Sequence, residues 1–187
     1  MSMRATVEDA LNNQINAEFY SAYLYLSMEA YFESINLKGF ANWMRVQVQE
    51  EMTHAMKIYD YIHDRGAKVT LGQIQTPKIS WMSPLEVFED AYGHEVLVTR
   101  LINDLVNTSE KDKDRSATSF LQWYVDEQVE EEASTDEIRK KLMMIKDSPG
   151  SLLLLDQKLA QRIFTNGAMV PSSLNAKKQQ KSVPGGA

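Results

Sequence analysis

Four long segments of this chain carry apolar residues at the three- and four-residue spacing of a buried helix face, and each stripe is interrupted near its middle by polar residues. The interrupting residues are Glu18 in the first segment, Glu51 and His54 in the second, Glu95 in the third, and Gln128 and Glu131 in the fourth. Burying an unpaired carboxylate costs several kcal/mol, so four independent interruptions would be expensive. A shared divalent metal ion would offset this cost, and the pattern therefore predicts an all-α bundle with a polar site inside it.

Glu51 and His54 form the most specific pair in this pattern. Three residues along a helix correspond to about 300° of rotation and roughly 4.5 Å of rise, so both side chains project from one face. Alone the pair is a weak signal, because helices with this spacing on a solvated face are common. The other interruptions favour a shared site, since Glu18, Glu51, Glu95 and Gln128 each lie about 11 to 13 residues into their helices and hence at one level of a bundle.

Capping and breaking residues predict the ends of the first two helices. Thr6 is expected to be the N-cap of a first helix that runs to about Ser34. The second helix should span about residues 38–65 and end at Gly66, a good residue for the position after a helix. The link between them is short, so the second helix should return antiparallel to the first.

The later helices have similar signals. Ser83-Pro84 supplies an N-cap and a first-turn proline for a third helix that ends near Asn107. A short charged turn at residues 111–114 again implies an antiparallel return, into a fourth helix over about residues 115–146. A short fifth helix is expected over roughly residues 151–164.

The segment 66–82 has no helical period and determines the topology. A second helix of about 28 residues is about 42 Å long, and about 17 extended residues reach at most about 56 Å. The segment can therefore cross the whole bundle, although loops of this length are unusual in compact domains. A long crossover is a feature of one family of four-helix bundles, so we predict a four-helix bundle with a long crossover between helices 2 and 3, which run parallel, and a short fifth C-terminal helix.

Composition excludes several classes of function. The net charge is −6, and residues 166–187 contain three lysines and no acid, so the remainder is near −9. An acidic body argues against nucleic-acid binding and suits attraction of cations. The chain has no cysteine, and we see no signal peptide and no apolar run long enough to cross a membrane. We expect a cytoplasmic protein with one domain over residues 1–165, a flexible basic tail over residues 166–187, and no membrane partner.

With these residues assembled, the chain resembles the non-haem ferritins of bacteria and archaea. The resemblance covers roughly residues 5–164 and includes the runs Gln14-Ile-Asn-Ala-Glu18, Asn42-Trp-Met-Arg45 and Phe120-Leu-Gln-Trp-Tyr-Val125. One Glu from each of two helices with Glu-x-x-His from the other two is the pattern of ferritin-like bundles. Here Gln128 stands where a second Glu-x-x-His motif would begin, as in non-haem ferritins and unlike bacterioferritins.

The resemblance implies an asymmetric diiron centre. One iron would be held by Glu18, Glu51 and His54, and the second by Glu51 as a bridge, Glu95 and, more weakly, the neutral amide of Gln128. The family also implies that Tyr25 lies beside this centre and can donate an electron, although an aromatic residue on that stripe could equally fill the core. A third iron site is implied at Glu50, Glu127, Glu130 and Glu131, where the alternative is a solvated acidic face.

The function implied is that of an iron-storage ferritin with ferroxidase activity. Fe(II) would be oxidised by O2 or H2O2, and Fe(III) would be stored as mineral inside a homo-oligomeric shell of about 24 copies. A rubrerythrin-like peroxidase would need a cysteine-rich iron domain, and a mini-ferritin would be shorter and lack the fifth helix. A storage subunit with an inactive site is disfavoured by the intact ligand set. The ligand types do not exclude a dimanganese or zinc bundle.

Overall fold

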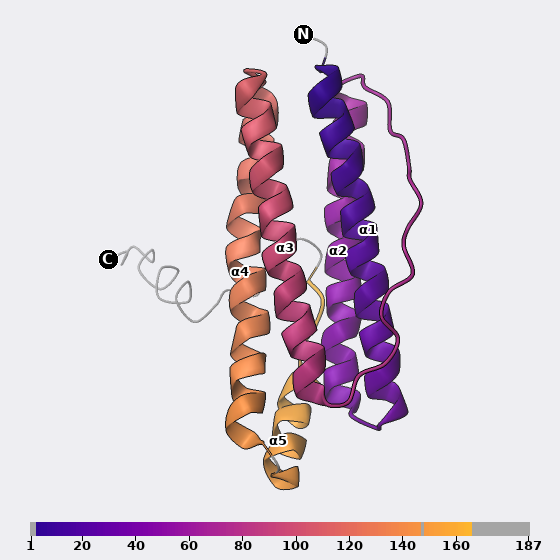
Figure 1. Cartoon of the computed structure of the whole chain (residues 1–187), viewed down its shortest axis with the longest axis vertical. Helices are drawn as coiled ribbons and strands as arrows, with labels where there is room; N and C mark the ends of the chain where they lie inside the picture. Colours follow the sequence, from indigo (N-terminus) through magenta and orange to yellow (C-terminus); the bar gives the residue numbers. More distant parts are fainter. Residues whose placement is uncertain (1–2, 147, 166–187) are drawn as a thin grey trace, which may run out of the picture.

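The protein is an elongated helical bundle, and its computed structural model describes residues 3–146 and 148–165 (Figure 1). Within these ranges it has no strand and five helices: α1 (Ala5–Ser34), α2 (Lys38–Asp64), α3 (Pro84–Lys111), α4 (Arg115–Ile145) and α5 (Pro149–Leu159). The predicted four-helix bundle with a short fifth helix is confirmed, with α2 and α3 parallel and the sequential pairs α1–α2 and α3–α4 antiparallel. The predicted basic tail lies outside the described residues. No helix described here has the length and apolarity to cross a membrane.

Two helix ends follow the strong local signals of the sequence. The Ser83 hydroxyl accepts a hydrogen bond from the Glu86 backbone N–H at 3.2 Å, and Pro84 is the first residue of α3. This satisfies one of the N–H groups that a helix leaves free at its start. Gly66 adopts a φ of 65° directly after α2, a conformation that costs a glycine little.

Two other ends differ from the prediction. α1 begins at Ala5 with Arg4 at the N-cap position, where no side chain caps the helix. The prediction for Thr6 was therefore wrong, and its hydroxyl donates instead to the Asp112 carboxylate at the end of α3. α3 also continues to Lys111 instead of ending near Asn107.

The crossover between α2 and α3 runs alongside α1 for most of the length of the bundle (Figure 1). Side chains of α1 make five hydrogen bonds to its backbone, and in three of them α1 is the donor. The Asn12 amide donates to the Lys68 carbonyl at 3.0 Å, the Asn16 amide to the Gln73 carbonyl at 3.2 Å, and the Ser27 hydroxyl to the Lys78 carbonyl at 2.7 Å. These bonds explain how a long segment without regular structure is held in a single path.

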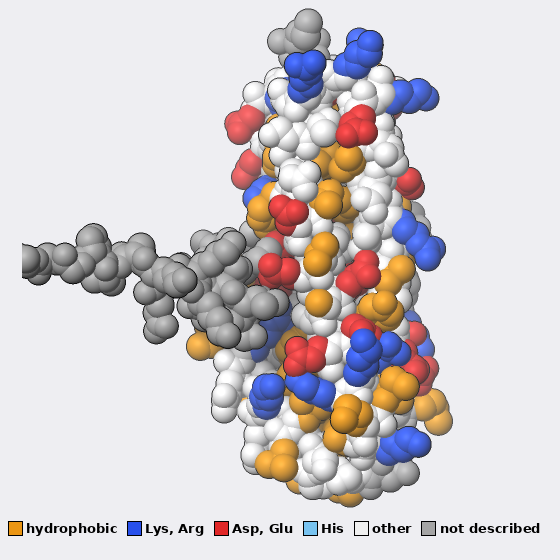
Figure 2. Space-filling model, turned by 90° about the vertical axis from the view of Figure 1, so that its left-hand side faces the viewer, with side chains coloured by type: hydrophobic (Ala, Val, Ile, Leu, Met, Phe, Trp, Pro, Cys, Tyr) orange, Lys and Arg blue, Asp and Glu red, His pale blue; other side chains and the backbone are white. Residues whose placement is uncertain are grey.

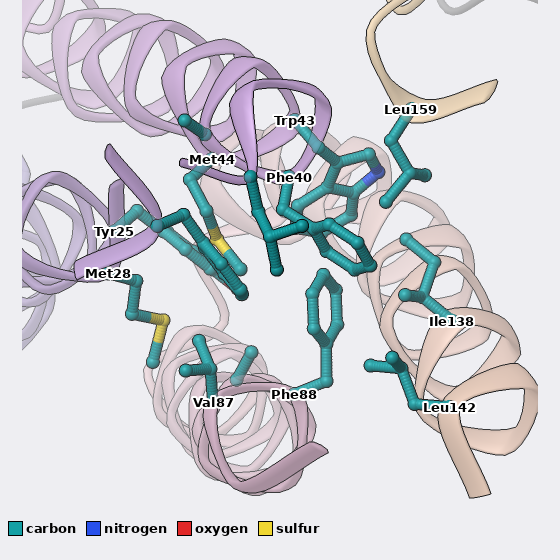
Figure 3. Packing of buried hydrophobic residues seen from close by; sticks show 14 of the residues in the cluster. Tyr25, Met28, Phe40, Trp43, Met44, Val87, Phe88, Ile138, Leu142 and Leu159 are labelled. Atoms are coloured by element: carbon teal, nitrogen blue, oxygen red, sulfur yellow. The ribbon is translucent and has the colours of Figure 1, made fainter. Parts of the chain in front are cut away.

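Apolar residues fill the bundle in two clusters that lie on either side of a polar layer. One cluster draws side chains from all five helices (Figure 3). Within it, the Phe32 and Phe40 rings stack with their centroids 5.0 Å apart. The other is built from the opposite halves of the four long helices, with Leu11, Ile58 and Ile102 among its fully buried members. The polar interruptions therefore lie in a region that is closed by apolar core at both ends.

α5 docks against the start of α2 and supplies the cap that α2 lacks. One oxygen of the Asp156 carboxylate accepts hydrogen bonds from the backbone N–H groups of Gly39 at 2.8 Å and Phe40 at 3.0 Å. α2 has no capping side chain of its own. A carboxylate at a helix N-terminus is also favoured by the helix dipole. The helices approach so closely that a Cβ on residue 39 would lie 1.7 Å from the Asp156 carbonyl oxygen.

Gly39→Ala is therefore expected to displace α5 and to lower the free energy of unfolding by about 2 kcal/mol or more, from overpacking and loss of the cap. Denaturant unfolding of the two proteins measures this change. Gly93→Ala is the matched control, because a Cβ at that position of α3 meets nothing within 4 Å. It should leave stability unchanged or raise it by up to about 1 kcal/mol through helix propensity. Equal effects of the two substitutions would contradict the docking argument.

Candidate metal centre

The predicted ligands of α1 and α2 meet inside the bundle. Glu18, Glu51 and His54 each offer one ligand atom, and these three atoms lie within 4.8 Å of one another. All three side chains are buried, and His54 Nδ1 lies 3.6 Å from Glu51 Oε2. The Gln14 amide donates to Glu18 Oε1 at 2.9 Å and so fixes the orientation of that carboxylate. Two carboxylates and an imidazole in this arrangement offer oxygen and nitrogen ligands to a transition-metal ion.

The predicted ligands of α3 and α4 are also buried and joined to one another. The Gln128 amide nitrogen lies 3.3 Å from both the backbone oxygen and Oε2 of Glu95. A metal ion at this position would take the oxygen of the same amide. Glu131 Oε2 accepts a hydrogen bond at 2.9 Å from the amide of Gln47 on α2, which links the two halves of the site.

His54 lies between carboxylates on both sides. Its Nε2 is 3.8 Å from Glu127 Oε1, and His54, Glu127 and Glu131 form a second group whose ligand atoms lie within 4.8 Å of one another. The other carboxylate oxygen of Glu127 is buried without a hydrogen-bond partner among the described residues. Such an oxygen is costly to bury, and a bound cation would offset that cost.

The crowding of acids in this layer shifts their protonation. Burial, with the nearby charges of Glu95 and Glu18, raises the pKa of Glu51 well above its usual value. Burial and Glu131 raise the pKa of Glu95 to about 8, and burial and Glu131 likewise raise the pKa of Glu127 to about 8. These carboxyl groups therefore retain protons near neutral pH, and a divalent cation that binds them must displace those protons.

Tyr25 lies directly beside the carboxylate layer, the level of the bundle at which five acids are buried: Glu18, Glu51, Glu95, Glu127 and Glu131. Tyr25 is fully buried, and its hydroxyl donates a hydrogen bond to Glu95 Oε1. Burial, with Glu95 and Glu51 nearby, raises the pKa of Tyr25 well above its usual value, so the phenol keeps its proton. Its ring also packs edge-on against Trp43, with centroids 6.4 Å apart, which places it at the boundary between the site and the apolar core.

The four residues predicted for a third iron site are only partly brought together. Glu127 and Glu131 share a group with His54, but Glu50 and Glu130 belong to neither of the groups found among the described residues. Glu50 instead forms an ion pair with Arg162, at 2.5 Å between Oε2 and Nη2. Burial raises the pKa of Glu50 to about 7 even though Arg162 acts in the opposite direction. Glu130 is exposed.

Several residues that contact the predicted ligands were not themselves predicted as site residues. Gln47 lies on the polar middle of the α2 stripe, one turn before Glu51, so periodicity carried a signal for it. On the far side of His54, Tyr124 donates to its backbone oxygen at 2.7 Å and the Trp123 ring lies edge-on at 5.4 Å. Nothing in the sequence marked Arg162, because its contact with Glu50 spans the fold.

The sequence of this chain is similar to those of known ferritins. The family model described as a ferritin-like domain matches residues 8–145. A bacterial non-heme ferritin from Staphylococcus saprophyticus is 44% identical over 156 residues, which cover 83% of this chain and 93% of the relative. Another from Staphylococcus aureus is 41% identical over 156 residues, covering 83% and 94%.

The fold of this chain also superposes on solved ferritin structures. An Archaeoglobus fulgidus ferritin engineered into a closed form superposes with a TM-score of 0.87 at 54% identity, covering 88% of this chain and all 100% of that one. An open-pore ferritin from the same archaeon gives 0.86 at 53% identity, covering 87% and 100%. The matched helices carry every residue of the carboxylate layer, from Glu18 on α1 to Glu131 on α4. With the fold, the buried acids and nearly full-length relatives in agreement, this chain belongs to the ferritin family.

Proposed function

We propose that this protein stores iron and that its carboxylate layer is a ferroxidase centre, which oxidises Fe(II) before Fe(III) enters a mineral. One observation carries the proposal: carboxylates from four helices are buried in one layer together with a single imidazole. Buried acids destabilise a bundle unless a cation neutralises them. Ferrous iron is the cation that family membership favours, and here it is the substrate.

Two sets of these residues would form two iron positions. Glu18, Glu51 and His54 would hold the first ion, while Glu51, Glu95 and the Gln128 amide oxygen would hold the second. Carboxylates are hard anionic ligands that stabilise Fe(III) more than Fe(II), so the oxidation becomes easier. The amide is neutral and a weaker ligand, which leaves the second ion free to move on. Two Fe(II) ions supply two electrons, which with two protons reduce O2 to H2O2, or H2O2 to two waters.

We also propose that Tyr25 supplies a further electron: with one electron from each of three Fe(II) ions it makes the four that, with four protons, reduce O2 to two waters. Its hydroxyl donates a hydrogen bond to Glu95, and once bound iron has displaced the proton of that carboxyl group, Glu95 gives the phenolic proton an acceptor when the ring loses an electron. Loss of a proton to Glu95 avoids forming a charged tyrosine radical in a buried site. The same contact orients Glu95, so Tyr25 would act both as a reductant and as a positioning group.

Storage requires a closed shell, and we propose a homo-oligomer of about 24 subunits. Apolar side chains are exposed among the charged ones on one face of the bundle, several of them near the end where α4 leads into α5 (Figure 2). Met144 is 83% exposed on α4, and Leu154 is 69% exposed on α5. Large apolar side chains at these exposures are typical of surfaces that a neighbouring subunit covers.

The test is to add Fe(II) without oxygen, admit O2 and follow Fe(III) formation, and then to measure the size and iron content of the particles by sedimentation. We expect rapid oxidation and large particles that retain iron. A stable monomer or dimer that retains none would contradict storage, and oxidation no faster than in buffer would contradict the ferroxidase centre. Zn(II), which is redox-inert, should compete with Fe(II) and release protons as it binds.

A further inference from the structure

Arg162 lies just beyond α5 and reaches back to the edge of the carboxylate layer. Its Nη2 binds Glu50 Oε2 at 2.5 Å, and its Nη1 donates to the Trp43 carbonyl oxygen at 3.3 Å. The guanidinium also lies over the Trp43 indole, 4.5 Å from the ring centroid. An ion pair, a hydrogen bond and a cation–π contact together fix the side chain on α2.

The backbone around Arg162 is held equally firmly. The Asn42 amide donates to the carbonyl oxygens of Leu159 at 3.2 Å and of Arg162 at 2.9 Å. The Leu159 carbonyl also accepts from the Arg162 backbone N–H at 3.2 Å, so these bonds together fix the turn that follows α5. Asp156 of α5 caps the start of α2, and Arg162, beyond α5, binds Glu50. The C-terminal segment therefore contacts α2 from Gly39 to Glu50, and Arg162 makes the contact nearest the buried carboxylates.

The contact with Arg162 turns the Glu50 carboxylate away from the predicted third iron site. Glu50 directly precedes Glu51 in α2, yet the group formed by His54, Glu127 and Glu131 does not include it. Its carboxylate is instead neutralised by a guanidinium. A divalent ion held by Glu127 and Glu131 would have to compete with Arg162 for Glu50, and the two cations would repel each other at short range.

We propose that Arg162 gates the third iron site: it withholds Glu50 from Glu127 and Glu131, and a third ion completes its ligand set only by displacing the guanidinium. This inference rests on the third site of the proposed function and adds the residue that controls it. Arg162 is a positioning residue, because it acts through Glu50 and touches no iron itself. The gate keeps the third site weak, which favours passage of iron onward over its retention.

The experiment is calorimetric titration of the metal-free assembled protein with Zn(II) at neutral pH, comparing wild type with Arg162→Gln. We expect both proteins to bind three ions per subunit, with the two tighter sites unchanged. The weakest site should gain about threefold to tenfold in affinity, the range set by one partly buried ion pair. Glu50→Gln should weaken that site, and Arg162→Gln should add nothing in the Glu50→Gln background.

Arg139→Gln is the matched control. Arg139 also pairs with a carboxylate, Asp136, and lies over the Tyr92 ring at 5.0 Å, so these contacts are on α4 and α3 and do not involve Glu50. Its substitution should leave all three affinities unchanged. Three ions with an unchanged or weakened third affinity in Arg162→Gln would overturn the gate alone. Two ions in both proteins would overturn the third site and the gate together. Should Arg162→Gln fail to assemble, Arg162→Met, which removes the charge but keeps an unbranched side chain to pack on Trp43, must strengthen the third site instead.

Discussion

Glu51→Gln should lower the initial rate of Fe(II) oxidation by at least about a hundredfold, since removing a group that stabilises developing charge commonly costs this much or more. The substitution keeps the shape of the side chain but removes the negative charge beside both proposed iron positions. Glu51 is buried, contacts His54, and lies close enough to Glu18 and Glu95 for their charges to act on it. Rapid mixing of the Fe(II)-loaded protein with O2, at two ions per subunit, measures the rate.

Glu89→Gln is the control for this prediction, because it makes the same chemical change at an exposed position of α3. Its oxidation rate should equal that of the wild type. His54→Ala should also slow the oxidation, by a smaller factor of about tenfold to a hundredfold, because it removes one ligand of the first ion. Fast oxidation that survives both Glu51→Gln and His54→Ala would exclude the carboxylate layer as the ferroxidase centre.

Glu127→Gln should raise the free energy of unfolding of the metal-free protein by about 2–4 kcal/mol at pH 8. The pKa of Glu127 is about 8 in the folded protein, against a usual value of 4.5. The group is protonated in both states below the lower value, and between the two values only the unfolded chain loses the proton. Glu127 therefore costs stability as the pH rises from about 5 to 8, and glutamine removes that cost.

The gain from Glu127→Gln should shrink steadily towards pH 5, which denaturant unfolding at several pH values would measure. Glu137→Gln on the same helix is the control, because its ion pair with Lys141 lowers the pKa of Glu137 below the usual value. That substitution should be neutral or slightly destabilising at pH 8. A stabilisation by Glu127→Gln that is the same at pH 5 and pH 8 would show that the carboxyl is not protonated in the fold.

Much of the fold could be predicted because its signals are local. Ser83-Pro84 and Gly66 determine helix ends through their own backbone preferences, and both predictions are confirmed. Where the partner is distant in sequence, local reasoning failed. The Thr6 hydroxyl binds Asp112, and Arg4 occupies the N-cap position of α1. α5 spans Pro149–Leu159, not residues 151–164. Asn42 of α2 binds the last carbonyl of α5, and Asp156 of α5 binds the start of α2.

The candidate site shows the same division between local and distant information. The position of each residue along its predicted helix indicated that Glu18, Glu51 and Glu95 lie at one level of the bundle, because spacing along a helix determines where each side chain lies and points. It could not give side-chain orientation across helices. Glu50 has the expected position in sequence but is turned towards Arg162, and this pairing depends on where the chain beyond α5 returns.

The crossover along α1 divides the bundle into two helical hairpins, and the proposed ligands divide in the same way. The first hairpin, α1–α2, carries Glu18, Glu51 and His54, whereas Glu95, Gln128 and Glu131 all belong to α3–α4. In the proposed centre, the first iron position would therefore be complete within one hairpin, and the second would form only when both hairpins are docked. Iron bound there acts as a cross-link between them, so loading the centre should suppress opening of the bundle, whereas a single ion at the first position would leave the hairpins free to separate.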